Sequence, residues 1–421
     1  MKKVIVRGPF LTRSGYGEHA RFVLRALRAN EEHFDIYAVP IQWGQTSWEA
    51  DDTDERRWFD FISTKTQNYI KNGGQFDVSL QVTIPNEWEQ LAPINIGVTA
   101  GIETTSISSQ WVEKAVNMDK IIVTSEHSKY GFENTTFRVK NQSTGEVNDN
   151  FKCETPVDVV GYPVKTIKPD KVDLDLQTDF NFLAMAQWGP RKNLENTITW
   201  FVEEFIDQPV GLVLKISRVK NNTYDRALCE GMLKRLLSKY EGRRCKIYLL
   251  HGDMTEQEIT SLYKNKKIKA LVSLAHGEGF GLPLFEAAYN GLPVIAPDWS
   301  GHVDFLHMPV VKKGKVKGKA KDKAMFSKVD YALGPVQEEA VWDGVIQKDS
   351  MWCYAEQGSY KMKLRELYKD HGRFVKQAKQ LQKHILKEMS EENMYSKMAN
   401  SILGIAGVSD QEDEEVVQVY G

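Results

Sequence analysis

The stretch HGEGFGLPLFEAAYNGLPVIAPDWSG, residues 276–301, determines how the rest of the chain is interpreted. A glycine-rich turn in it leads into a helix whose first position is Pro283. Gly279 and Gly281 lack a Cβ, so the backbone can approach a ligand, and the N–H groups of a helix N-terminus favour an anion such as a diphosphate. We expect Glu278 and Glu286 to face one cleft at the carboxyl end of a parallel sheet. The plain alternative is a tight turn with two solvated glutamates.

Short β-branched strands alternate with amphipathic helices on both sides of this stretch, which predicts an α/β fold with parallel sheets. The pattern is clearest in the second half, where strands are expected at 180–187, 211–217, 246–252, 270–277 and 293–298, and helices at 193–206, 223–240 and 255–264. In the first half, strands are expected at 3–7, 34–41, 76–84, 94–102 and 120–126, and a loop over 8–17 precedes the first helix.

Two Rossmann-like domains facing each other across a cleft follow from this pattern. The first is expected to span 1–168, with completion by a C-terminal helix over 390–408, and the second to span 178–388. A polar, proline-containing linker separates them over 163–180. The lysine-rich segment KKGKVKGKAKDK, 312–323, is expected to project from the second domain as a loop or hairpin, followed by one long helix over 359–389.

Composition excludes several classes of protein. The chain has 421 residues with 41% hydrophobic residues and a formal net charge of −2, which is typical of a globular protein and not of a generally nucleic-acid-binding one. The first residues are too charged for a signal peptide. The cysteines are scattered, so no disulfide framework or zinc site is expected: Cys153, Cys229, Cys245 and Cys353. We expect a cytoplasmic protein of two or three domains.

The motif GEGFGLP followed by Glu286 resembles the E-x7-E signature of retaining glycosyltransferases of the GT-B fold, family 4. GPRKNLE (189–195) resembles the phosphate-binding turn of the family's second domain, and GLPVIAPDWSGHVDFL resembles the segment after the signature. The resemblance is good over 180–306, weaker over 93–163 and generic elsewhere. It implies a GT-B fold and a nucleotide-sugar donor.

The resemblance assigns roles around the donor. Glu286 would accept hydrogen bonds from the ribose hydroxyls, and Glu278 would hold hydroxyls of the donor sugar. Backbone amides for the sugar and diphosphate would come from Gly279, Phe280, Gly281 and Leu282. Positive charge for the diphosphate would come from Arg191 and Lys192, with a further contribution from Lys215. The base would lie near His251 and Met254, and a loop with Gly15 and Gly17 would close over donor and acceptor.

The sequence departs from the family at two positions. Gln187 stands where many relatives carry an arginine, and Arg191 would compensate for its absence. Glu103 stands near the place of a common first-domain histidine, so it is our candidate to bind a sugar hydroxyl or to take the acceptor's proton. The plain alternative for Glu103 is an acid in a satisfied turn.

No metal or other cofactor is expected: Asp173 and Asp175 form a DxD sequence, which some glycosyltransferases use for a metal, but they lie in the expected linker. The donor is expected to be a UDP- or GDP-sugar, with UDP-glucose as the first guess. Acidic residues outnumber basic ones over 1–165, which disfavours a lipid acceptor. The lysines of 312–323 are either a solvated loop or a contact for a polyanionic acceptor, including DNA with a hydroxylated base.

The sequence thus predicts a retaining hexosyltransferase that moves a hexose, with glucose the first candidate, to a hydroxyl acceptor such as a glycan or a hydroxymethylated DNA base. Two alternatives stay open. One is a non-catalytic nucleotide-sugar or carbohydrate-binding partner subunit, which the residues at Gln187 and Glu103 would favour. The other is a nucleic-acid-binding protein that uses the lysine-rich segment.

Overall fold

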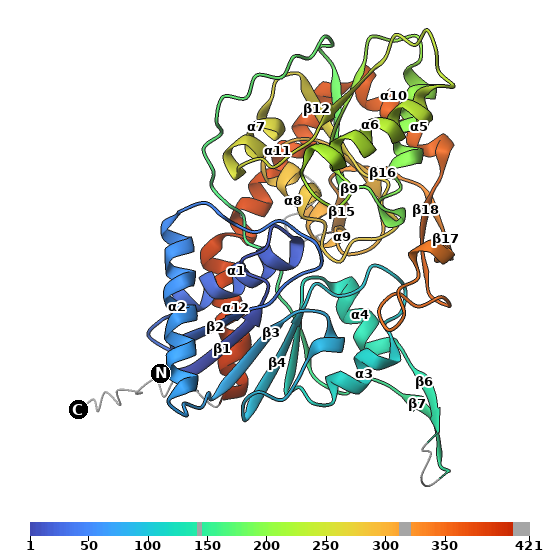
Figure 1. Cartoon of the computed structure of the whole chain (residues 1–421). Helices are drawn as coiled ribbons and strands as arrows, with labels where there is room; N and C mark the ends of the chain where they lie inside the picture. Colours follow the sequence, from blue (N-terminus) through green and yellow to red (C-terminus); the bar gives the residue numbers. More distant parts are fainter. Residues whose placement is uncertain (141–144, 311–320, 407–421) are drawn as a thin grey trace, which may run out of the picture.

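The computed structural model describes residues 1–140, 145–310 and 321–406. Two six-stranded sheets form the centres of two layered α/β units, one built by the first part of the chain and one by the second (Figure 1). Every pair of neighbouring strands within these two sheets is parallel. The predicted α/β class with two parallel sheets is confirmed.

The first sheet has the strand order β2-β1-β3-β4-β5-β8. Its central strands are rich in Val, Ile and Leu and are buried on both faces, as expected for a parallel sheet covered by helices. Its strands are β1 (Lys2–Gly8), β2 (Phe34–Pro40), β3 (Val78–Val82), β4 (Ile94–Thr99), β5 (Lys120–Val123) and β8 (Val157–Val159). The hairpin β6 (Phe137–Lys140) and β7 (Val147–Phe151) extends from this unit.

Hydroxyl residues start the helices of the first unit. The helices are α1 (Gly15–Arg28), α2 (Asp54–Lys71), α3 (Ser109–Ala115) and α4 (Glu126–Asn134), and each N-cap side chain accepts a backbone N–H. The expected loop over 8–17 is wrong at its end. Helix α1 begins at Gly15 because the Ser14 side chain accepts the N–H of Gly17 and caps the helix there.

The second sheet has the strand order β11-β10-β9-β12-β13-β16. This is the doubly wound order, in which the chain leaves the central strand in opposite directions and opens a crevice between the carboxyl ends of β9 and β12. Its strands are β9 (Asn181–Gln187), β10 (Gly211–Ser217), β11 (Lys246–Leu250), β12 (Ile268–Val272), β13 (Val294–Pro297) and β16 (Ser327–Val329).

Helices cover this sheet on both faces. They are α5 (Leu194–Phe205), α6 (Thr223–Leu237), α7 (Glu256–Lys264), α8 (Leu282–Tyr289), α9 (Val303–Leu306), α10 (Gln357–Lys369) and α11 (His371–Glu388). The single helix expected over 359–389 is wrong: two helices meet at Asp370, whose backbone (φ −132, ψ 52) is not helical.

The lysine-rich segment lies mostly at residues 311–320, outside the described residues. The described chain on either side of it forms an antiparallel pair, β14 (His307–Val310) with β15 (Lys321–Ala324). A second hairpin, β17 (Tyr331–Pro335) with β18 (Met351–Ala355), lies at the other edge of this unit (Figure 1).

The last helix, α12 (Glu391–Ala406), returns to the first unit and packs along α1 (Figure 1). Lys120 donates to the Ser401 carbonyl at 3.0 Å, and the Ser401 hydroxyl donates to Asp158 at 2.6 Å. These contacts attach α12 to β5 and β8 of the first sheet. Between β8 and β9 the chain has no regular secondary structure, as the linker prediction implies.

The glycine-rich loop of the second unit touches the first unit directly. A Cβ at Gly279 would lie 2.3 Å from the Ala100 carbonyl oxygen, a distance that no real side chain tolerates. The Ser125 hydroxyl donates to the Gly279 carbonyl at 2.7 Å, and the rings of Tyr162 and Phe280 have centroids 4.9 Å apart. A glycine at 279 is therefore what lets the two units meet in this arrangement.

Gly279→Ala should force the two units apart or displace the loop, because the new methyl group has no space. We expect a lower melting temperature, corresponding to a loss of about 1–3 kcal/mol, and a larger radius of gyration in small-angle scattering. The control is Gly231→Ala in α6, where a Cβ meets nothing within 4 Å, and which should stabilise the protein by about 0.5–1 kcal/mol. Equal melting temperatures and radii of gyration in the two variants would contradict the role of Gly279 in the contact between the two units.

Candidate functional site

The glycine-rich loop between β12 and α8 forms one side of the candidate site. Gly281 takes a left-handed backbone conformation (φ 94) and is the N-cap of α8, and Pro283 follows in the first turn. The N–H of Glu278 donates to the Ser300 hydroxyl at 3.0 Å, which fixes the loop against the segment after β13. Within the described chain, the N–H groups of Gly279, Phe280 and Gly281 have no hydrogen-bond acceptor.

Two cations hold the Glu278 carboxylate. Lys192 Nζ lies 2.5 Å from Oε1, and Arg191 Nη1 lies 3.0 Å from Oε2. Both come from the short turn after β9, so the contact joins the carboxyl ends of β9 and β12 at the crevice of the sheet. Burial would raise the pKa of Glu278, which is only 6% exposed, but the charges of Lys192 and Arg191 outweigh it and lower that pKa to about 2.

Arg191 also reaches the first unit. Its Nη1 donates to the Gly277 carbonyl at 2.8 Å, and its Nη2 lies 3.5 Å from Glu103 Oε1. Glu103 lies in the loop after β4. The backbone of this loop packs closely against Gly277, since a Cβ added at Gly277 would lie 1.9 Å from the Glu103 carbonyl oxygen. The structure thus brings together Glu103, Arg191, Lys192 and Glu278, four residues that the sequence analysis selected.

Positive charge is concentrated on the turn after β9. Burial, together with the charge of Arg191, lowers the pKa of Lys192, and Glu278 opposes this effect only in part. Two adjacent half-buried cations, Arg191 and Lys192, face one buried carboxylate, Glu278, and one more exposed carboxylate, Glu103. The turn is therefore suited to receive an additional anion.

A cavity of about 710 Å³ lies between the two units and contains the second predicted acid, Glu286. Tyr263 donates its hydroxyl to Glu286 Oε2 at 2.8 Å. Burial raises the pKa of Glu286 to about 7, although the hydrogen bond from Tyr263 and the charge of Lys165 act in the opposite direction. Glu286 can therefore change its charge near neutral pH when a ligand arrives.

The other predicted donor residues divide between this cavity and its surroundings. Gly15, Lys215, Met254 and Leu282 line it together with Glu286. Lys215 donates to the Gly252 carbonyl at 2.5 Å, so its ammonium is held at the rim and burial lowers its pKa.

Three predicted residues are engaged elsewhere in the fold. The His251 ring hydrogen-bonds through Nε2 to the Asp225 carboxylate at 2.8 Å, and His251 does not line the cavity. The Phe280 side chain is buried against Phe285 and Phe305, so only its backbone can contribute to a site. Gly17 packs under Thr12, whose carbonyl oxygen a Cβ would approach to 2.0 Å.

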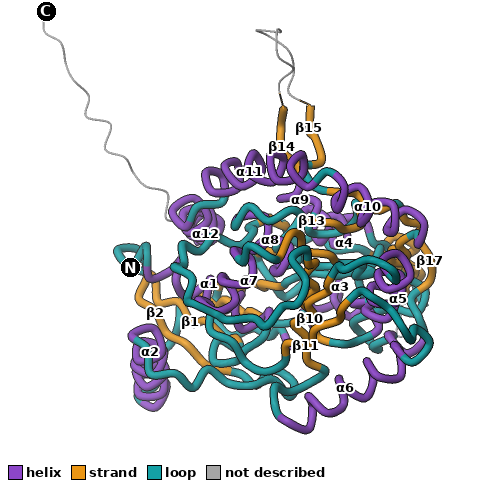
Figure 2. Tube along the Cα trace, turned by 90° about the horizontal axis from the view of Figure 1, so that it is seen from above, coloured by secondary structure: helices purple, strands orange, loops and turns teal. Residues whose placement is uncertain are grey.

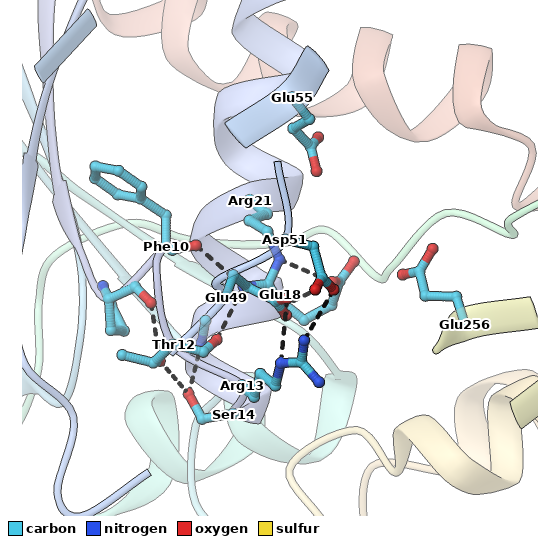
Figure 3. Close-up of polar contacts among 12 residues, drawn as sticks. Phe10, Thr12, Arg13, Ser14, Glu18, Arg21, Glu49, Asp51, Glu55 and Glu256 are labelled. Carbon is cyan, nitrogen blue, oxygen red and sulfur yellow. Dashed lines mark hydrogen bonds and ion pairs between the residues drawn. The ribbon is translucent and has the colours of Figure 1, made fainter. Parts of the chain in front are cut away.

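A wall of paired charges closes the cavity on the side of the first unit, and the sequence analysis did not identify it. Glu18 lies 2.9 Å from Arg25 Nη1 and 2.7 Å from Lys165 Nζ, and these cations hold its pKa below the usual range although burial opposes them. Figure 3 shows Arg13 between Glu49 and Asp51 on the same wall. The i, i+3, i+7 spacing of Glu18, Arg21 and Arg25 on α1 was the available signal.

Asp225, Cys229 and His251 are the one group in the described chain whose potential metal-ligand atoms lie within 4.8 Å of one another. Hydrogen bonds already explain the position of Asp225, because its carboxylate accepts the N–H groups of Arg218 and Val219 as well as the contact with His251. The group therefore fits a structural role better than a metal site.

Comparison with known proteins identifies this architecture. Residues 232–333 match the family described as glycosyl transferases group 1. One similar solved structure is Anabaena Alr3699/HepE in complex with UDP and glucose, with 12% identity and a TM-score of 0.56; the match covers 96% of this chain and 100% of that chain. Another is a sucrose-phosphate synthase from Thermosynechococcus elongatus, with 12% identity and a TM-score of 0.60; the match covers 97% of this chain and 100% of that chain. The chain has the GT-B fold. The comparison with curated protein sequences finds no match.

The GT-B fold places the matched segment, 232–333, in the second unit, where it contains both Glu278 and Glu286. Among the described helices, none combines the length and the apolar character that a bilayer crossing requires. The candidate site of this GT-B chain comprises the four-residue charge cluster and the neighbouring cavity at the junction of its two units.

Tyr263→Phe should raise the pKa of Glu286 above its value of about 7, because the lost hydrogen bond stabilises the carboxylate. A carboxyl ¹³C NMR titration, with Glu286→Gln used for assignment, measures the change. Tyr289→Phe is the control, since Tyr289 lines the same cavity and its hydroxyl makes no hydrogen bond to Glu286 in the described structure. An unchanged titration in Tyr263→Phe would show that this hydrogen bond does not hold the carboxylate in solution.

Proposed function

We propose that this protein is a retaining glycosyltransferase that moves a hexose from a nucleotide-diphosphate sugar to a hydroxyl acceptor. The observation that supports this most is the cluster of Glu278, Lys192 and Arg191 at the head of α8, next to a cavity that holds Glu286. It joins a cation pair, a glycine-rich helix N-terminus and two acids at one crevice. The match of residues 232–333 to glycosyl transferases group 1 agrees with this function.

The departure of the diphosphate is the electrostatic problem of the reaction. Arg191 and Lys192 supply two positive charges. The backbone amides of the glycine-rich loop, at the N-terminus of α8, would add their dipoles to stabilise the negative charge of the diphosphate. Within the protein, Glu103 and Glu278 neutralise these cations. A bound diphosphate would replace Glu103 as a partner of Arg191 and leave that carboxylate available to the acceptor.

The two acids then take different roles. Glu286, with Met254 and Lys215 beside it in the cavity, would accept hydrogen bonds from the ribose, and the base would lie along the same wall. Glu278 would bind hydroxyls of the donor sugar, and Glu103 would bind a hydroxyl or take the acceptor's proton. The acceptor would attack the face that the diphosphate leaves, and closure of the two units over the substrates would exclude water.

UDP-glucose is the first donor to test, with GDP- and ADP-sugars as the alternatives. The Anabaena protein of similar fold has also been solved with UDP-glucose (12% identity, TM-score 0.53). No metal is proposed for the reaction, so chelation by EDTA should leave turnover unchanged.

A donor screen is the direct test of this function. The cognate nucleotide sugar should raise the melting temperature, and the enzyme should slowly release the nucleoside diphosphate from it without an acceptor. Stabilisation without any release would favour the non-catalytic binding subunit instead. No stabilisation by any nucleotide sugar would overturn the proposal.

Nucleotide affinity should rise with pH through the pKa of Glu286. Ribose hydroxyls favour the ionised carboxylate, and the acid is protonated below about pH 7, so binding must release a proton at low pH. The dissociation constant measured by calorimetry should therefore be about tenfold weaker at pH 6 than at pH 8. Glu286→Gln should bind weakly at every pH, and Asp51→Asn, on the opposite wall, should keep the wild-type profile. A flat wild-type profile would remove the ribose role.

Glu278→Gln should reduce turnover by about a hundredfold or more, because the donor sugar loses a charged hydrogen-bond acceptor. Affinity for the nucleoside diphosphate should not fall, since Lys192 and Arg191 lose the carboxylate that competes for them. Steady-state kinetics and calorimetry together separate the two effects. Glu195→Gln, an exposed acid in α5, is the control, and a wild-type rate in Glu278→Gln would exclude Glu278 from the reaction.

A further inference from the structure

Helix α11 has two chemically distinct faces. Its apolar residues Phe374, Ala378, Leu381 and Ile385 are buried against the second unit, and α11 packs on α8 and β14. The opposite face carries exposed cations at spacings of three and four residues: Arg373, Lys376, Lys379, Lys383 and Lys387. We call these five residues the α11 basic stripe. At a rise of 1.5 Å per residue, the stripe extends over about 20 Å along the exposed face of the helix.

Most of this charge is not neutralised within the protein. Among the described residues, Lys376, Lys379 and Lys383 have no carboxylate within 4 Å. Arg373 lies 3.5 Å from Asp370, and Lys387 lies 2.8 Å from Glu388, at the two ends of the stripe. The centre of the stripe therefore consists of three unpaired cations on an otherwise slightly acidic protein.

A groove continues the stripe at its N-terminal end. It has a volume of about 880 Å³, and its charged lining residues are five cations and three acids: Lys323, Lys328, Lys363, Arg373, Lys376, Asp330, Glu366 and Asp370. Gln377 donates to the Ala324 carbonyl at 3.1 Å and fixes α11 against β15. In Figure 2, β14 and β15 rise beside α11 on the same side of the molecule.

From this arrangement we infer that the α11 basic stripe binds the phosphate backbone of a nucleic acid. A row of cations along one helix face, about one per helical turn, matches a linear polyanion, and each phosphate contact would release counterions. An anionic membrane fits less well because the apolar face of α11 is turned inward and Leu386 is the one exposed large apolar side chain on the helix. The inference rests on described residues alone and does not depend on the proposed transferase activity.

The test measures the binding of a labelled DNA duplex of about 20 base pairs by fluorescence anisotropy between about 50 and 200 mM NaCl. The full-length protein should bind with a steep dependence on salt. The triple variant Lys376→Glu, Lys379→Glu, Lys383→Glu should bind at least about tenfold more weakly, with the slope of log K against log salt reduced by about 3. All variants keep the lysine-rich segment, so the difference reports the stripe.

The matched control is Lys234→Glu, Arg235→Glu, Lys239→Glu, which makes the same charge change at exposed positions in and just after α6, on the opposite side of the molecule (Figure 2). It should leave affinity and slope close to those of the unmodified protein. Equal losses in both variants would overturn the inference, because they would show an effect of net charge only. Binding to phosphatidylserine vesicles that depends on the stripe, without duplex binding, would also overturn it. Both variants should keep the circular dichroism spectrum of the unmodified protein and its rate of nucleoside diphosphate release from the nucleotide sugar. These two controls would show that the fold and the donor site are intact.

Discussion

The ion cluster of Glu278, Lys192, Arg191 and Glu103 is the interaction on which the site depends. A carboxylate as buried as Glu278 stays ionised only because two cations lie within about 3 Å of it. The cations and the carboxylate come from the ends of two neighbouring strands, and Glu103 comes from the opposite unit. The cluster therefore links the crevice of one sheet to the other half of the molecule.

Much of this arrangement was predictable from local sequence. Buried β-branched runs predicted five of the six strands in each sheet, and the short edge strands β8 and β16 were not predicted. Arg191 was proposed through the family resemblance, and it meets Glu278 because the carboxyl ends of the neighbouring strands β9 and β12 lie at one edge of the sheet. Glu103 could be proposed only through the family resemblance.

Contacts between distant segments were not predictable. Helix α2 has few buried residues and a weak apolar pattern, and it was missed. The break at Asp370 interrupts a continuous helical pattern without a proline or glycine at the break itself. Lys165 pairs with Glu18 and Glu256 across the cavity, and Asp225 of α6 hydrogen-bonds to His251, which follows β11. Each of these depends on tertiary packing that a single sequence does not record.

The path of the chain between its two halves restricts how they can move. The chain passes from the first unit to the second before β9 and returns to the first unit before α12. These two connecting segments are hydrogen-bonded to each other, since the N–H of Val164 donates to the Met389 carbonyl at 2.8 Å. Because the two connecting segments are joined at one place, they act as a hinge and oppose sliding of one unit past the other. Opening of the cleft should therefore be a rotation about that point, with the largest displacement at the far rim near β17 and β18.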